Sequence, residues 1–139
     1  MSSRKGPHAG RTALVVHYDM EAISGLQRAF NETGYLTIVA RDLPTALLAI
    51  TQHYFDVAIV SSRLAEGGDG WPLAGVLHLV FPKAFITVLT PEEPDVPTFR
   101  SAINNGVSEV YQENKDAGEI VQAISARLSG SGPSDVSVQ

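Results

Sequence analysis

Short apolar segments alternate with amphipathic segments five times along the chain, and this alternation restricts the fold more than any other feature. The predicted strands are residues 13–16, 36–40, 57–60, 84–89 and 107–111. Segments with apolar residues at helical spacing follow each strand, at 22–30, 42–53, 71–80, 97–104 and 119–128. Regular alternation of this kind predicts a parallel sheet with helices on both faces and right-handed crossovers.

The natural topology for this pattern is an α/β, doubly wound, five-stranded parallel sheet of order 2-1-3-4-5. The run 57–60 is apolar throughout, as expected for a central strand that is buried on both faces. In such sheets the functional residues lie just beyond the carboxyl ends of the strands. We therefore expect His17, Tyr18, Asp19 and Ser61 around one crevice, with Thr90 and Glu113 beside it.

Local signals support several helix boundaries. Gly34 is expected to end the first helix in a left-handed conformation. Asp42 has the side chain of an N-cap, and Pro44 fits the first turn of the second helix. In the third helix the inward-facing residues are predicted to be Leu73, Val76, Leu77 and Val80.

Composition excludes several classes of protein. The formal net charge of −5 argues against a nucleic-acid-binding domain. The chain has no cysteine, which excludes disulfides and thiolate chemistry and fits a reducing compartment. No apolar run is long enough to span a membrane, so a cytoplasmic protein is predicted. We expect a disordered arm at 1–11, one domain at 12–128, and a flexible tail or linker at 129–139.

A set of motifs points to a known family. They are residues 55–60, Arg63 with Leu64, Asp69 with Gly70, Thr90, and Gly106 with Val107. In order and spacing they resemble the receiver domain of bacterial response regulators, a flavodoxin-like fold. The resemblance covers roughly residues 12–128 and implies phosphorelay signal transduction in a two-component system.

The residues that carry the chemistry of that family differ here. The acidic pair of the first strand aligns with His17 and Tyr18, which leaves Asp19 as the one carboxylate. The phospho-acceptor aspartate aligns with Ser61, and the lysine of the fifth strand aligns with Glu113. The switch hydroxyl aligns with Thr90. The switch aromatic aligns with Val110, while Tyr111 is one place later and on the other face of the strand.

These differences predict a pseudo-receiver, meaning a receiver domain that is not phosphorylated and has no catalytic residue, cofactor or metal. One carboxylate with neutral hydroxyls makes a poor Mg²⁺ site, and an unactivated serine is a weak nucleophile. A hydrogen bond between Glu113 and His17 is expected to fill the space of the lost acidic cluster. The predicted function is phosphorylation-independent protein–protein interaction.

The resemblance also implies partners. A histidine kinase, an output protein or an output domain would bind through roughly residues 97–128, and a homodimer would use the same face. Direct nucleic-acid and membrane binding are not expected. Three different functions stay open: a phosphorelay receiver with an unusual acceptor, a small-ligand sensor that uses the emptied crevice, and a small flavodoxin-like enzyme.

Further chemistry is open at the sequence level. His17 could serve as a base for Ser61, with Asp19 orienting it, although no nucleophile elbow surrounds the serine. His17, Asp19 and Glu113 could form a metal site. The glycine-rich segment 67–70 precedes a helix and could hold a phosphate, and a strand bulge could bring Lys115 toward the crevice.

Overall fold

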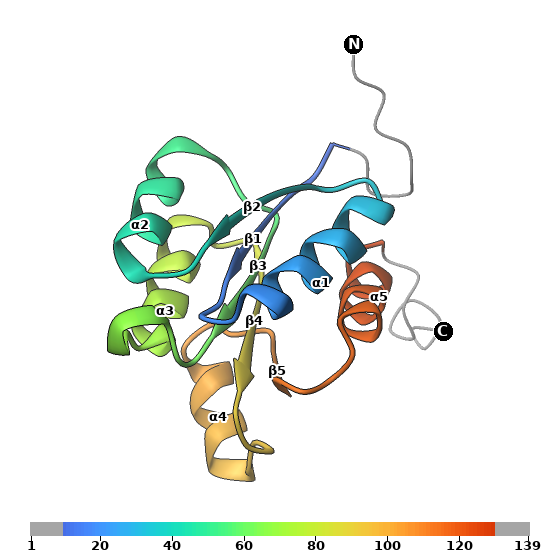
Figure 1. Cartoon of the computed structure of the whole chain (residues 1–139). Helices are drawn as coiled ribbons and strands as arrows, with labels where there is room; N and C mark the ends of the chain where they lie inside the picture. Colours follow the sequence, from blue (N-terminus) through green and yellow to red (C-terminus); the bar gives the residue numbers. More distant parts are fainter. Residues whose placement is uncertain (1–9, 130–139) are drawn as a thin grey trace.

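The computed structural model describes residues 10–129 and contains one parallel sheet of five strands in the order β2-β1-β3-β4-β5 (Figure 1). This confirms the predicted topology. The elements in chain order are β1 (Thr12–Val16), α1 (Met20–Glu32), β2 (Leu36–Ala40), α2 (Leu43–Gln52), β3 (Val57–Ser61), the 3₁₀ turn η1 (Ala65–Gly67), α3 (Gly70–Val80), β4 (Phe85–Thr90), α4 (Val96–Asn104), β5 (Glu109–Gln112) and α5 (Ala117–Leu128).

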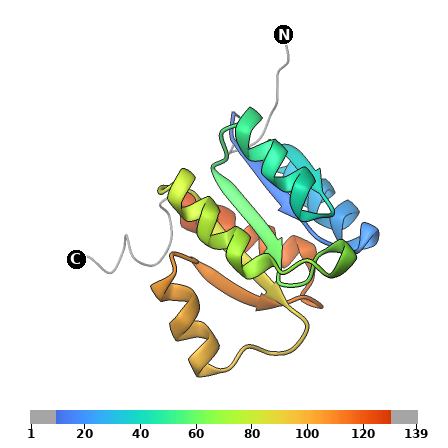
Figure 2. The same cartoon turned by 90° about the vertical axis from the view of Figure 1, so that its left-hand side faces the viewer.

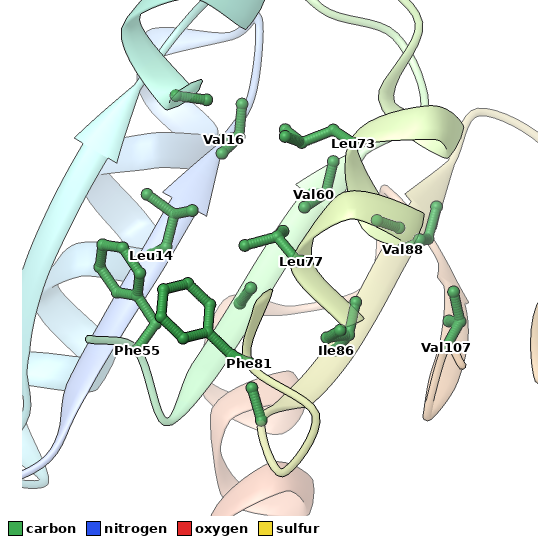
Figure 3. Close-up of a cluster of buried hydrophobic side chains, with 14 of the residues drawn as sticks. Leu14, Val16, Phe55, Val60, Leu73, Leu77, Phe81, Ile86, Val88 and Val107 are labelled. Carbon is green, nitrogen blue, oxygen red and sulfur yellow. The ribbon is translucent and has the colours of Figure 1, made fainter. Parts of the chain in front are cut away.

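Helices cover both faces of the sheet. Helices α1 and α5 pack together on one face, and α2, α3 and α4 cover the other (Figures 1 and 2). Each face has its own cluster of buried apolar side chains. The cluster beneath α2 and α3 contains Leu14, Phe55, Val60 and Leu77, all fully buried (Figure 3). Burying side chains of this size stabilises the fold by about 1.5–3 kcal/mol each.

Strand β3 is the centre of the sheet. It pairs with β1 on one side and β4 on the other, and all five of its residues are buried. Val57 and Ile59 point to the α1/α5 side, and Ala58 and Val60 point to the α2/α3 side. The strand is therefore apolar at every position from 57 to 60 because it has no solvent-facing side.

An aspartate caps the N-terminus of each of the five α-helices in residues 10–129. Each carboxylate accepts a hydrogen bond from a backbone N–H of the first turn, which satisfies a donor that the helix itself leaves free. The caps are Asp19, Asp42, Asp69, Asp95 and Asp116. The prediction of Asp42 as an N-cap is confirmed, with its Oδ1 at 2.8 Å from the Thr45 nitrogen.

The end of α1 also follows the sequence prediction. Gly34 has a φ of 96°, and the Tyr35 N–H donates to the Phe30 carbonyl at 3.0 Å. This is the left-handed termination that favours glycine, because a side chain would be strained at this φ.

The predicted inward face of α3 is partly wrong. Leu73 and Leu77 are buried, but Val76 and Val80 are 37% and 48% exposed, and Ala74 is buried instead. Only a narrow stripe of the helix surface faces the sheet, and the two valines lie to one side of it. The predicted start of the fifth strand at 107 is also early, since β5 begins at Glu109.

The predicted arm and tail fall almost wholly on residues 1–9 and 130–139, which lie outside the described residues. Of the arm, Arg11 is described, and its carbonyl accepts a hydrogen bond from the Leu36 N–H at 2.9 Å. Within residues 10–129, no helix is long and apolar enough to cross a membrane.

Candidate functional site

The carboxyl ends of four parallel strands meet at one edge of the sheet. They bring together the residues that the sequence singled out, because neighbouring parallel strands end at the same level. The residues at or just beyond these ends are His17, Tyr18, Asp19, Ser61, Thr90 and Glu113. A residue without a predicted role, Arg63, lies among them.

Arg63, Glu113 and Tyr18 form a closed hydrogen-bonded triangle. Arg63 Nη2 donates to Glu113 Oε2 at 2.7 Å and to the Tyr18 hydroxyl oxygen at 2.9 Å. The Tyr18 hydroxyl donates to Glu113 Oε1 at 3.1 Å. The guanidinium carbon also lies 4.9 Å from the centroid of the Tyr18 ring. The triangle links the segments that follow β1, β3 and β5.

The electrostatics of the triangle are consistent with this pattern. Partial burial raises the pKa of the Tyr18 hydroxyl, and its hydrogen bond to the Glu113 carboxylate raises it further. The same carboxylate raises the pKa of the Arg63 guanidinium. Tyr18 therefore stays neutral and donates its proton to the carboxylate, and the Arg63 guanidinium stays charged.

His17 is buried beside the triangle and takes no part in it. Its Nδ1 accepts a hydrogen bond from the Asp19 N–H at 3.1 Å, so the proton of the neutral ring is on Nε2. Nε2 is buried and has no hydrogen-bond partner. Burial lowers the pKa of His17, Glu113 and Asp19 oppose this, and Arg63 adds to the lowering. The ring stacks on Tyr18 at 4.8 Å.

The expected hydrogen bond between Glu113 and His17 is wrong. Both oxygens of Glu113 bond to other groups, Oε1 to Tyr18 and Oε2 to Arg63. The reason is that Arg63 reaches the same space and offers a full charge, which a buried neutral imidazole does not.

Ser61 is the last residue of β3 and has no exposed surface. Its hydroxyl oxygen accepts a hydrogen bond from the Arg63 backbone N–H at 3.2 Å. Neither ring nitrogen of His17 bonds to it, since Nδ1 is occupied and Nε2 is unpartnered. The serine–histidine pair is therefore not formed.

Thr90 ends β4 at the same edge, and Val110 and Tyr111 lie within β5. The Thr90 hydroxyl donates to the Glu92 carbonyl at 2.6 Å, so it is directed to the loop after β4. Val110 belongs to the core cluster on the α4 side, and Tyr111 packs against the cluster on the α1/α5 side. The two side chains occupy opposite faces of β5, as its alternation requires.

The receiver family holds Mg²⁺ at this edge, but the residues here do not fit that ion. The Asp19 carboxylate already caps α1, and the Glu113 carboxylate is paired with the guanidinium of Arg63. Hard divalent cations need several free oxygen ligands. In residues 10–129 there is no group of three or more His, Asp or Glu side chains arranged to hold a metal ion, so His17, Asp19 and Glu113 do not form a metal site.

Lys115 and the glycine-rich loop do not supply an anion site at this edge. Lys115 Nζ pairs with Glu119 Oε1 at 3.7 Å and lies over the Tyr111 ring, so its charge is already partnered. The Gly70 N–H at the start of α3 donates to the Ser62 carbonyl at 3.0 Å, and the next N–H, of Trp71, donates to Asp69. Because these donors are used, the loop offers no ready phosphate cradle.

Sequence reasoning assigned no role to Arg63 and did not consider Arg41. Arg41 Nη2 donates to the Tyr18 carbonyl at 2.8 Å and so holds the start of the β1–α1 connection. The one available signal was electrostatic. A glutamate at the lysine position of the fifth strand requires a cation nearby, and Arg63 follows the third strand by two residues.

No family model matches the chain, and no curated protein matches it. Solved structures do. A CheY-like response regulator receiver domain protein from Methanospirillum hungatei JF-1 superposes with a TM-score of 0.75 at 17% identity, covering 85% of this chain and 93% of that one. The signal receiver domain of an HD domain-containing protein from Pseudomonas fluorescens Pf-5 gives 0.73 at 24% identity, covering 88% and 98%.

A third structure is HP1043, an orphan response regulator of H. pylori, with a TM-score of 0.75 at 15% identity and coverage of 88% of this chain and 99% of that one. These matches extend over nearly the whole described part of the chain, at sequence identities that establish architecture. The strand order, the helix layers and the superpositions together show that this chain has the fold of response-regulator receiver domains.

Proposed function

We propose that the chain is a pseudo-receiver, a signalling module that is not phosphorylated and whose strand-end crevice holds an intramolecular, half-exposed ion pair. The observation that carries this proposal is the Arg63–Glu113 contact at 2.7 Å, tied to Tyr18. It occupies the edge at which the receiver family places its metal ion and phospho-acceptor.

The ion pair reverses the charge arrangement of that family. A receiver has carboxylates on the first strand and a lysine on the fifth, whereas here the fifth strand ends in Glu113 and the cation comes from the segment after β3. Both charges are satisfied without a metal or a phosphoryl group. The arrangement is therefore complete in the unmodified protein, which supports a single, permanent state of the crevice.

Ser61 supports the same conclusion. At 0% exposure its hydroxyl cannot meet a phosphodonor without movement of the strand end, and it lacks a hydrogen-bonded base. A serine hydroxyl needs such a base to act as a nucleophile. The two features disfavour a phosphorelay through this residue.

The proposed role is protein–protein interaction, with a histidine kinase, an output protein or an output domain bound through residues 97–128. A surface hollow of about 410 Å³ lies within this region, lined in part by Phe99, Val110 and Tyr111. Ile103 on α4 is 63% exposed. A hollow lined in part by apolar groups, with an exposed aliphatic side chain on the same helix, suits a protein ligand.

Intact-mass measurement after incubation with acetyl phosphate and Mg²⁺ tests the proposal. We expect no gain of a phosphoryl group and no change in Trp71 fluorescence, whereas a phosphorylatable receiver treated in parallel gains mass. The matched variant is Ser61→Ala. A gain in the wild-type protein that is lost in this variant would overturn the proposal and establish a relay with serine as the acceptor.

A further inference from the structure

Two neighbouring helices, α2 and α3, carry no charged residue. All 10 Lys and Arg and all 15 Asp and Glu residues of the chain lie outside residues 43–52 and 70–80. The two helices contact each other on the same face of the sheet (Figure 2). They share an exposed apolar surface, here called the α2/α3 face, formed by Leu47, Leu48, Tyr54, Val76, Leu79 and Val80.

Helical geometry places these side chains on one continuous surface. Successive residues turn by about 100°. On α3, His78 lies on the flank toward β5, where its ring packs against Gly106, so Val76 and Val80 lie on the opposite flank, toward α2. The same geometry turns Leu47 of α2 toward α3. These three side chains therefore line the seam between the helices.

The outward side chains extend this surface. Leu79 is 80% exposed and Leu48 is 57% exposed, one on each helix. Tyr54, also more than half exposed, packs edge-on against Phe81 at 5.3 Å and so closes the end of the seam. Exposed aliphatic side chains that are contiguous in this way mark an interaction surface rather than ordinary solvent-facing residues.

The ends of this chain do not suit the α2/α3 face. Residues 1–9 contain no large aliphatic side chain except Met1, and residues 130–139 contain two valines among glycines, serines and polar residues. Such segments cannot bury six apolar side chains.

A second copy of the chain fits better, for an electrostatic reason. Two copies that each carry a formal charge of −5 repel one another. They can approach without burying a charge where both surfaces are uncharged, and the α2/α3 face meets this condition on both sides of a two-fold axis. Its apolar residues then cover the same residues of the other copy.

We propose that the chain forms a symmetric homodimer through the α2/α3 face. Helices of 10 and 11 residues are each about 15 Å long and about 10 Å wide. Side by side they present roughly 300 Å² per copy, which is less than a standard specific interface buries. The dimer is therefore weak and reversible, with a dissociation constant of roughly tens to hundreds of micromolar. This places self-association on a different face from residues 97–128, which remain available to the signalling partner.

Sedimentation velocity between roughly 1 μM and 1 mM protein tests the proposal. We expect a shift from monomer to dimer across this range. Leu79→Glu should weaken the dimer at least about tenfold, because the symmetric contact would bury two unpaired carboxylates. Leu48→Glu on α2 is a second variant with the same expected effect. Both sites are exposed, and circular dichroism verifies that the variants are folded.

The matched control is Ile103→Glu, which adds the same charge at a residue of α4 that is 63% exposed. It should change the dissociation constant by less than about threefold. Added salt should tighten the dimer, because it screens the repulsion between two anionic copies and no ion pair holds the contact. A protein that stays monomeric at every concentration, or a dimer lost in Ile103→Glu and kept in Leu79→Glu, would overturn the proposal.

Discussion

Replacing His17 by leucine should stabilise this protein, although His17 is among its most buried residues. Nε2 of His17 is a buried donor without a partner. Leucine has a similar volume and no polar group to leave unsatisfied. Most substitutions at buried sites cost about 1 kcal/mol or more, so a gain would be a distinctive result.

The expected magnitude follows from the contacts of the ring. Removing an unpartnered buried donor recovers about 1–3 kcal/mol. The substitution also removes the hydrogen bond from the Asp19 N–H, worth about 0.5–1.5 kcal/mol, although Asp19 is exposed and water can replace the imidazole. Loss of the stacking on Tyr18 reduces the gain further. The net change is a gain of about 0–2 kcal/mol in the free energy of unfolding near neutral pH.

The gain should increase at lower pH. The pKa of His17 in the folded protein is below its ordinary value of 6.5, so the unfolded chain binds more protons between these two values. The free energy of unfolding of the wild-type protein therefore falls as the pH drops below 6.5. At about pH 5.5 this loss is at most about 1.4 kcal/mol, and the His17→Leu variant does not have it.

Urea unfolding of both proteins at about pH 8 and about pH 5.5, followed by Trp71 fluorescence, measures the effect. His53→Gln is the matched control, since it replaces a histidine that is exposed rather than buried. A variant less stable than the wild-type protein by more than about 2 kcal/mol at both pH values would refute the reasoning. So would a difference that does not grow as the pH is lowered.

Three further predictions concern the crevice and the loop beside it. Glu113→Lys should lower the urea midpoint of unfolding, because it places a second cation beside Arg63. Adding Arg63→Glu to this variant should recover part of the lost stability. Purely additive effects of the two substitutions in this double-mutant cycle would contradict the ion pair. Ser61→Asp alone should gain no phosphoryl group from acetyl phosphate, because the metal site is still lacking, and a mass gain would show otherwise. Gly70→Ala should lower the free energy of unfolding by about 1–3 kcal/mol, because the added Cβ would overlap the Ser61 carbonyl oxygen. Gly75→Ala in the same helix adds a Cβ in open space and should stabilise the protein. Equal effects of the two substitutions would contradict the close contact between Gly70 and Ser61.

Much of the architecture could be read from local sequence. The alternation of strand and helix, the fully apolar run of β3, the glycine after α1 and the N-cap at Asp42 are all confirmed. Each of these depends on a few consecutive residues and on backbone preferences that act within one element. The crossover rule then joins the elements into a parallel sheet, since it leaves few topologies for such a pattern.

The sequence also located the edge of the sheet where polar side chains gather, because their positions at the strand ends follow from the topology. It did not predict how they pair. Glu113 was expected to bond to His17, and the tertiary structure directs it to Arg63 and Tyr18 instead. The partner of Glu113 depends on which long side chain reaches it from the end of another strand. The residues that bond to one another here are 45–95 positions apart in the chain.

The outer surface of α3 shows the same limit. Helical spacing placed Val76 and Val80 with Leu73 and Leu77 on one apolar stripe, because apolar periodicity does not show which part of a wide stripe contacts the sheet. Leu73, Ala74 and Leu77 face the sheet, which leaves the two valines on the flank of α3, where they stay partly exposed. The sequence by itself determined the elements, their order and the edge that carries the polar residues. The tertiary structure decided the partners of each polar group and which apolar residues remain at the surface, since both depend on contacts between elements that are distant in the chain.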